Sequence, residues 1–86
     1  MREVEVLLVT SPGCHFCDFA RQVLTRLAAD FPLSVSELPL FSPCGQELAQ
    51  RDGIMFPPGI YVAGEFFGYG RVSGAKLRRR LEAIAR

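Results

Sequence analysis

The stretch that decides the fold comprises residues 11–17, Ser11-Pro12-Gly13-Cys14-His15-Phe16-Cys17. It separates a short apolar run, residues 4–10, from a longer segment with helical periodicity. The apolar run is rich in β-branched residues, which predicts a buried strand. Pro12 and Gly13 predict a turn, so Cys14 opens the helix that follows.

The segment after this turn is predicted to be a helix. Its apolar residues recur at steps of three and four from Phe16 to Phe31, with polar and charged residues between them. This spacing puts Phe16, Phe19 and Val23 on the face of the helix that packs on the core. Pro32 ends the pattern, because proline lacks an amide donor and restricts the residue before it.

The place of Cys14 at a helix start has a chemical consequence. The first turn of a helix carries unpaired amide donors and the positive end of the macrodipole, both of which stabilise a thiolate. The pKa of a free cysteine is about 8.5, and it is lowered by a helix N-terminus, a nearby imidazole such as His15 or a Cys-x-x-Cys partner. Cys17 lies one turn further on, within disulfide reach of Cys14. The two thiols can therefore open and close one bond.

Two cysteines at this spacing also ligate zinc or iron-sulfur clusters. A structural zinc needs four ligands, and beyond the pair this chain offers only Cys44 and His15, which shares the turn with the two cysteines. A redox dithiol that uses no metal and no organic cofactor is therefore the main prediction. The alternative is a metal or iron-sulfur protein in which two chains share a site through Cys14 and Cys17. Cys44 itself is either an incidental thiol or a reactive one.

The composition predicts one folded domain over residues 1–86, since 49% of the 86 residues are hydrophobic. The net charge of +1 gives no strong field for nucleic acid or an anionic membrane. The last sixteen residues are nevertheless basic, with only Glu82 set against the cations Arg71, Lys76, Arg78, Arg79, Arg80 and Arg86. This cluster predicts a solvated helix face, with an anion or partner patch as the alternative.

The chain shows no secretory signal and no apolar run of the roughly 20 residues that a membrane span needs. An odd number of cysteines argues against a structural disulfide framework. We therefore expect a cytoplasmic monomer that binds neither membrane nor nucleic acid.

The rest of the chain predicts two further helices and three further strands. A strand over residues 33–40 contains Pro39, which favours an edge position. Ser42 and Pro43 have the form of a cap and first residue of a helix that Asp52-Gly53 ends. The remaining elements are a hairpin of residues 60–63 and 66–67 around Gly64-Glu65, then a helix capped by Ser73 with an apolar stripe of Leu77, Leu81, Ile84 and Ala85.

The predicted order is β-α-β-α-β-β-α, an α/β domain with a four-stranded mixed sheet flanked by helices. The first β-α-β unit makes its strands parallel, and the terminal hairpin adds antiparallel strands. Loops that leave the carboxyl ends of parallel strands gather at one edge of such a sheet, where reactive groups tend to lie. Cys14 leaves the first strand at that edge.

A Cys-x-x-Cys at the strand-to-helix turn of this pattern resembles the thioredoxin superfamily, and the short chain is most similar to its glutaredoxin branch. Residues 58–64, Pro58-Gly59-Ile60-Tyr61-Val62-Ala63-Gly64, resemble the family's segment of cis-proline, strand and turn glycine. The resemblance implies a thiol-disulfide oxidoreductase, in which Cys14 is the nucleophile and Cys17 resolves the mixed disulfide. Pro58 would be the cis-proline that faces them, with the preceding backbone free to pair with substrate.

The candidate substrate contacts around this pair are His15, Phe16, Phe56, Pro57, Pro58 and Tyr69, with Arg71 as a possible partner of a substrate carboxylate. The expected substrates are disulfide-bearing proteins or small thiols. Glutaredoxins that use glutathione usually carry Cys-Pro-Tyr-Cys after a basic residue, Thr-Val before the cis-proline, and a glycine pair followed by acidic residues. Here the corresponding residues are His15-Phe16, Thr10-Ser11, Met55-Phe56-Pro57 and Gly68-Tyr69-Gly70-Arg71. These differences argue against glutathione and leave the electron donor open.

Overall fold

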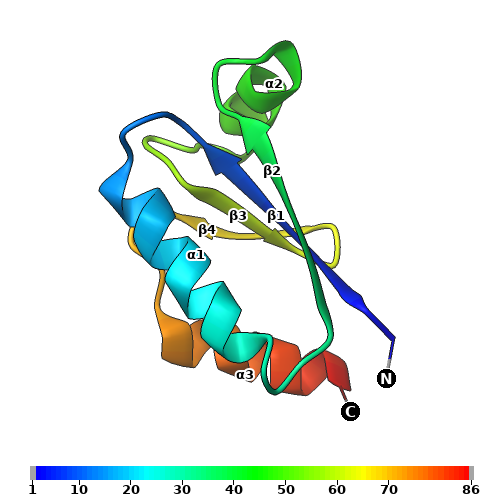
Figure 1. Cartoon of the computed structure of the whole chain (residues 1–86). Helices are drawn as coiled ribbons and strands as arrows, with labels where there is room; N and C mark the ends of the chain where they lie inside the picture. Colours follow the sequence, from blue (N-terminus) through cyan, green and yellow to red (C-terminus); the bar gives the residue numbers. More distant parts are fainter. Residues whose placement is uncertain (1, 86) are drawn as a thin grey trace.

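The computed structural model describes residues 2–85, in which four strands and three helices follow the predicted order (Figure 1). The elements are β1 (Val4–Thr10), α1 (His15–Leu27), β2 (Leu33–Pro39), α2 (Pro43–Asp52), β3 (Gly59–Val62), β4 (Glu65–Tyr69) and α3 (Gly74–Ala85). Over these residues no helix combines the length and the apolar character that crossing a bilayer requires.

The four strands form one mixed sheet in the order β2-β1-β3-β4. β1 and β2 are parallel, with Val4 opposite Leu33 and Thr10 opposite Pro39. β3 pairs antiparallel with both β1 and β4. The predicted edge position of the strand that contains Pro39 is therefore confirmed. Because the two strands are parallel, their C-terminal residues Thr10 and Pro39 lie at the same end of the sheet. The loop that carries Cys14 leaves the sheet there.

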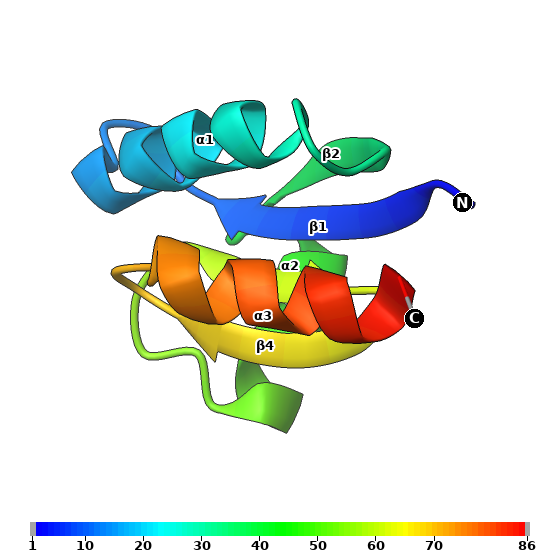
Figure 2. The same cartoon turned by 90° about the horizontal axis from the view of Figure 1, so that it is seen from below.

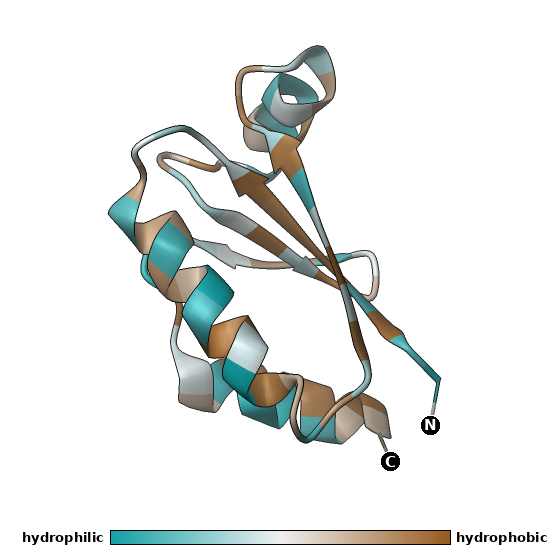
Figure 3. Cartoon of the chain, in the orientation of Figure 1, coloured by the Kyte–Doolittle hydropathy of each residue, from teal (hydrophilic) through white to brown (hydrophobic). Residues whose placement is uncertain are grey.

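Helices cover the two faces of the sheet unequally. α1 and α3 pack on one face, where they bury apolar side chains of β1 and β3 such as Leu8 and Ile60. α2 lies on the other face, near the end of the sheet, over a smaller cluster that includes Val9 and Tyr61 (Figure 1). Figure 3 shows β1 brown along much of its length, whereas α1 alternates brown and teal. β1 is a largely buried strand, and the helices are amphipathic.

The first helix is shorter than its apolar spacing, because α1 ends at Leu27 with Ala28 as its cap, whereas the spacing runs on to Phe31. The amides of Asp30 and Phe31 both donate to the Leu27 carbonyl, at 3.0 and 2.9 Å, so the chain tightens into a turn before Pro32. Phe31 still reaches the core, where it is only 8% exposed. The spacing of apolar residues that is typical of a helix therefore continues for one turn beyond Leu27, the last residue of α1.

The helix caps agree with the predictions. Ser42 Oγ accepts a hydrogen bond from the Gly45 amide at 3.1 Å, and Gly53 ends α2 in the left-handed region with φ of 71°. Ser73 Oγ accepts from the Lys76 amide at 3.3 Å at the start of α3. A serine side chain therefore satisfies one of the first amides of each of these helices.

The apolar stripe predicted for α3 is only half correct. Leu77 and Leu81 are buried, whereas Ile84 is 39% exposed and Ala85 is exposed. The last turn of α3 borders a surface groove at the start of β1, beside Val4 and Glu5, instead of the core. The helix extends beyond the part of the sheet against which it packs.

Candidate active site

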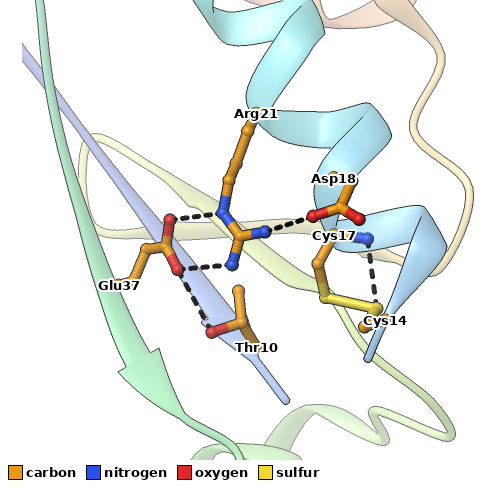
Figure 4. Close-up of a disulfide and its surroundings, with 6 residues drawn as sticks. All are labelled: Thr10, Cys14, Cys17, Asp18, Arg21 and Glu37. Atoms are coloured by element: carbon orange, nitrogen blue, oxygen red, sulfur yellow. Dashed lines mark hydrogen bonds and ion pairs between the residues drawn. A yellow bond between two sulfur atoms is a disulfide. The ribbon is translucent and has the colours of Figure 1, made fainter. Parts of the chain in front are cut away.

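The two cysteines of the Cys-x-x-Cys lie at the start of α1 and form a disulfide (Figure 4). Cys14 is the N-cap residue, with extended backbone at φ −95° and ψ 107°, and Cys17 lies in the first helical turn. Their Cα atoms are 5.2 Å apart, well inside the range that a disulfide spans. The strand-turn-helix geometry therefore brings the two sulfurs together, as the spacing predicts.

The two cysteines differ sharply in exposure. Cys17 is fully buried at 0%, whereas Cys14 is partly exposed and its neighbour His15 is exposed. An incoming disulfide can therefore reach the Cys14 sulfur from solvent, while the Cys17 sulfur lies behind it.

The Cys14 sulfur receives a direct hydrogen bond from the backbone. The Cys17 amide donates to Cys14 Sγ at 3.1 Å, so the sulfur takes the place that a serine or aspartate oxygen takes in an ordinary cap. A thiolate accepts such a bond more strongly than a thiol does, because the bond is then charge-assisted. The positive end of the α1 macrodipole acts in the same direction.

A network of charged side chains ties α1 to the sheet close behind this pair (Figure 4). Arg21 donates to both carboxylate oxygens of Glu37 on β2, at 2.7 and 2.8 Å, and to Asp18 at 2.7 Å. Thr10, at the end of β1, donates to Glu37 at 3.3 Å. The Arg21 hydrogen bonds lower the pKa of Glu37, and the Glu37 carboxylate raises the pKa of Arg21. The network fixes the second turn of α1 over β1 and β2.

The loop before β3 forms the opposite wall of the site. The Pro57–Pro58 peptide bond is cis, which confirms the expectation from the resemblance, and Pro58 is fully buried. Phe56 and Pro57 face the turn before α1 across an open cleft of about 440 Å³. The cleft is lined by Ser11, Pro12, Gly13, Cys14, His15, Phe16, Phe56 and Pro57.

Aromatic rings continue this wall away from Cys14. The Phe56 ring lies 6.1 Å from the Phe16 ring and meets the Tyr69 ring edge-on at 5.2 Å, centroid to centroid. These three side chains are 38–48% exposed, so they form a surface instead of a core. The prediction that Phe16 packs in the core is therefore wrong, because its ring faces Phe56 in the cleft while the next residue, Cys17, takes the buried position in this turn.

Gly70 supports the aromatic wall and was not singled out from the sequence. Its φ of 77° lies in the left-handed region, and its amide donates to the Pro58 carbonyl at 2.8 Å. Any side chain there would meet the Phe56 ring, since a Cβ would lie 2.5 Å from Phe56 Cε2. The only sign of this role in the sequence is the pair of glycines at 68 and 70. The contact that requires Gly70 is with Phe56, fourteen residues earlier in the chain, and the sequence alone does not reveal it.

Two other candidate residues lie outside the cleft. Arg71 lines a separate groove between β4 and α3, and Cys44 is an exposed free cysteine in the first turn of α2. Among residues 2–85, no three His, Cys, Asp or Glu side chains gather closely enough to hold a metal ion. The cleft thus unites Cys14, His15, Phe16, Phe56 and Pro57, with Pro58 beneath it and Tyr69 beside it.

Comparison with solved structures shows the same fold in thioredoxins and a glutaredoxin. A point mutant of thioredoxin from Halobacterium salinarum NRC-1 superposes with a TM-score of 0.67 at 20% identity, over 96% of this chain and 75% of that one. A thioredoxin from Thermus thermophilus gives 0.58 at 24% identity, over 96% and 74%. Glutaredoxin 1 from Francisella tularensis, complexed with cacodylate, gives 0.54 at 19% identity, over 95% and 96%.

Sequence comparison adds the family. No curated protein sequence matches this chain closely enough to count as a relative. The family model for glutaredoxin matches residues 6–67, which run from the middle of β1 to the middle of β4 and include both cysteines and the cis-proline. With this match over most of its length, the chain belongs to the glutaredoxin family and is a thiol-disulfide oxidoreductase.

Proposed function

We propose that Cys14 attacks disulfides of protein or small-thiol substrates and that Cys17 resolves the resulting mixed disulfide. The observation that carries this proposal is the unequal setting of the two sulfurs. Cys14 Sγ is partly exposed at the mouth of the cleft and accepts the Cys17 amide at 3.1 Å, whereas Cys17 is fully buried. One sulfur is thus accessible and placed where a backbone amide and the helix N-terminus favour a thiolate, and the other lies behind it.

The proposed reaction is a pair of thiol-disulfide exchanges. The Cys14 thiolate attacks one sulfur of the substrate disulfide, forms a Cys14–substrate disulfide and releases one substrate thiolate. The Cys17 thiolate then attacks the Cys14 sulfur and releases the second substrate thiolate, which leaves the Cys14–Cys17 disulfide. Two electrons pass to the substrate, whose thiolates take up the two protons given up by the cysteines. An external thiol or dithiol donor then reduces the protein disulfide.

The walls of the cleft suggest how a substrate is held. Phe16, Phe56 and Tyr69 offer half-exposed aromatic surface beside Cys14. The backbone before Pro58 is available to pair with an extended substrate segment as an added strand. His15 is exposed at the same mouth. Its imidazole lies next in sequence to the attacking Cys14, where a positive charge would favour the thiolate. A disulfide within an extended polypeptide suits this surface better than a compact small molecule.

We further propose that the electron donor is a dithiol in preference to glutathione. The residue types with which glutathione-using glutaredoxins hold that tripeptide are replaced here before Cys14, before Pro58 and after Gly70. A cytoplasmic setting completes the proposal, because the dithiol state persists where thiols are kept reduced. Electron transport and control of the cellular thiol balance would then be the protein's wider role.

Trapping of substrates tests the assigned roles. The Cys17→Ser variant should accumulate proteins on Cys14 as mixed disulfides that dithiothreitol releases, and the Cys14→Ser variant should hold none. Both variants are best made with Cys44→Ser, which removes the exposed third thiol. Equal trapping by the two variants would contradict the roles. Iron or zinc bound stoichiometrically to the purified protein would instead favour a site shared by two chains.

A further inference from the structure

A second hollow lies beside the aromatic wall, between the edge strand β4 and α3. We call it the basic groove, and its volume is about 580 Å³. Figure 2 shows α3 running alongside β4, and both elements contribute to its lining. Its polar and aromatic lining residues include Tyr69, Arg71, Ser73, Lys76, Arg79 and Arg80. Four of these six side chains are cationic, and no carboxylate of the described residues lines the groove.

The cations of the groove have no acidic partner within residues 2–85. The ion pairs of this part of the chain involve Arg21, Arg51 and Arg78, each of which meets an aspartate or glutamate. Arg78 shows the contrast on the same helix, since it binds Asp30 at 2.6 Å and lies over Phe31. Glu65 on β4 and Glu82 on α3 are the nearest acids in sequence, and neither lines the groove. The positive charge around the groove is therefore not neutralised by an ion pair within these residues.

One of the four cations is held in place by an aromatic ring. The Arg80 guanidinium lies over the Phe67 ring of β4, with its carbon 5.2 Å from the ring centroid, and the residue is partly buried. A stacked guanidinium keeps its donors free for a planar anion such as a carboxylate. Arg71, Lys76 and Arg79 are exposed and stand around the same hollow. The groove is therefore open and positively charged, with one fixed anchor.

Tyr69 joins this groove to the active site. Its ring packs edge-on against Phe56 of the cleft, and the same residue lines the basic groove. A polypeptide that reaches Cys14 and crosses Phe56 and Tyr69 therefore arrives next at Arg71. The two surfaces are continuous along one route.

We propose that the basic groove binds an acidic segment that flanks the disulfide of the substrate protein. This inference rests on the proposed function of the cleft and adds its substrate class: disulfides neighboured by several Asp or Glu residues. Single exposed ion pairs contribute little, but several unpaired cations around one hollow raise the local potential and speed the encounter with an acidic partner. The groove thus acts on substrate selection and leaves the exchange chemistry to the cysteines.

The test compares two peptides that share one disulfide and differ only in its flank, four Glu in one and four Gln in the other. With dithiothreitol as donor, we expect the wild-type protein to prefer the acidic peptide by about tenfold in kcat/KM, within the range of electrostatic steering. K76E/R79E should lower this ratio close to one. Arg2→Glu, a charge reversal just before β1 and outside the groove, should leave the ratio at its wild-type value. The preference should also shrink as salt is raised from about 0.05 to about 0.5 M.

Two further readouts separate the possible failures. A wild-type ratio near one, or an equal ratio in wild type and K76E/R79E, would overturn the groove proposal while the proposed function stands. If neither peptide is reduced, the proposed function fails. NMR titration with a cysteine-free acidic peptide then judges the groove alone: amide shifts at Arg71, Lys76 and Arg79 support it, and their absence overturns it. Tighter binding of a single-stranded oligonucleotide to those residues would assign the groove to nucleic acid and overturn the proposal.

Discussion

The ring of Phe56 meets the ring of Tyr69 edge-on, with the two centroids 5.2 Å apart, beside the partly exposed Cys14. Edge-to-face pairs of this kind contribute about 0.5–1.5 kcal/mol beyond the area they bury. Both side chains are partly exposed, so the pair lies at the surface and not in the core. Because Phe56 lines the cleft beside Cys14, the pair is placed to contact a bound substrate.

Loss of the Phe56 ring should weaken substrate binding more than it weakens the fold. We expect Phe56→Ala to raise KM for a protein disulfide about fivefold to tenfold, in line with roughly 1–1.5 kcal/mol of lost contact. Phe41→Ala is the matched control, because Phe41 is an exposed phenylalanine outside the cleft at 75% exposure. Steady-state kinetics of both variants decide the matter, and similar KM values for the two would contradict a role of Phe56 in binding.

Gly70 should tolerate no side chain without disturbing the same wall. Gly70→Ala places a methyl group against the Phe56 ring and forces a left-handed φ of 77° on a residue with a Cβ. We expect a loss of about 1–2 kcal/mol in the free energy of unfolding. Chemical denaturation measures it. Gly64→Ala, with φ of 81° but open space around it, separates the backbone cost from the contact with Phe56.

Alkylation should distinguish the two cysteines in the reduced protein. In a Cys44→Ser background, limiting iodoacetamide should modify Cys14 before Cys17, because Cys17 is fully buried and Cys14 is not. Peptide mapping by mass spectrometry gives the order of labelling. Faster labelling of Cys17 would reverse the proposed assignment of nucleophile and resolving cysteine.

Acid should remove the contribution of the Arg21–Glu37 pair. The pKa of Glu37 is lowered in the folded state, chiefly by the Arg21 hydrogen bonds, so its stabilisation is present above pH 4.5 and disappears as pH falls through the folded pKa. Both side chains are about 40% exposed, which limits the effect to about 0.5–1 kcal/mol. Glu37→Gln should therefore be less stable than wild type at pH 7 and equal to it near pH 2. A constant difference at both pH values would exclude the charge as its cause.

High pH should lower the stability of the fold through Tyr61, which lies on the face of the sheet that α2 covers. Burial, and secondly the 2.7 Å hydrogen bond that Tyr61 donates to Asp52, raise the pKa of Tyr61 to about 12. The unfolded chain loses this proton near pH 10 and the folded chain retains it, so stability falls as pH rises from 10 to 12. The difference between the two pKa values bounds the loss in the free energy of unfolding at about 3 kcal/mol. Tyr61→Phe should show a shallower decline over the same range in pH-dependent denaturation.

The fold could be predicted from the sequence because its signals are local or nearly so. The apolar run before Ser11, the turn at Pro12-Gly13 and the caps at Ser42 and Ser73 each depend on neighbours within a few residues. The cis bond before Pro58 came from the resemblance, since nothing local distinguishes it from a trans bond. The roles of the site residues remain predictions that the experiments above test.

What the sequence left undetermined depends on contacts across the fold. Glu37 and Arg21 look like two ordinary surface charges until α1 is laid over β2, although they are only 16 residues apart in the chain. Gly70 and Phe56 are likewise separate until β4 ends beneath the loop before Pro58. The apolar spacing alone does not fix the end of α1, because Phe31 keeps the helical spacing while its backbone has already turned.

The sulfur of Cys14 is both the proposed reacting atom and the cap of α1, so each turnover changes how the end of a helix is held. The disulfide form retains the 3.1 Å bond from the Cys17 amide to Cys14 Sγ, and a thiolate accepts the same bond more strongly because it is then charge-assisted. Protection of that amide against deuterium exchange should therefore follow the redox state, greatest in the reduced protein. A partner that contacts the first turn of α1 can thereby tell the reduced enzyme from the oxidised one.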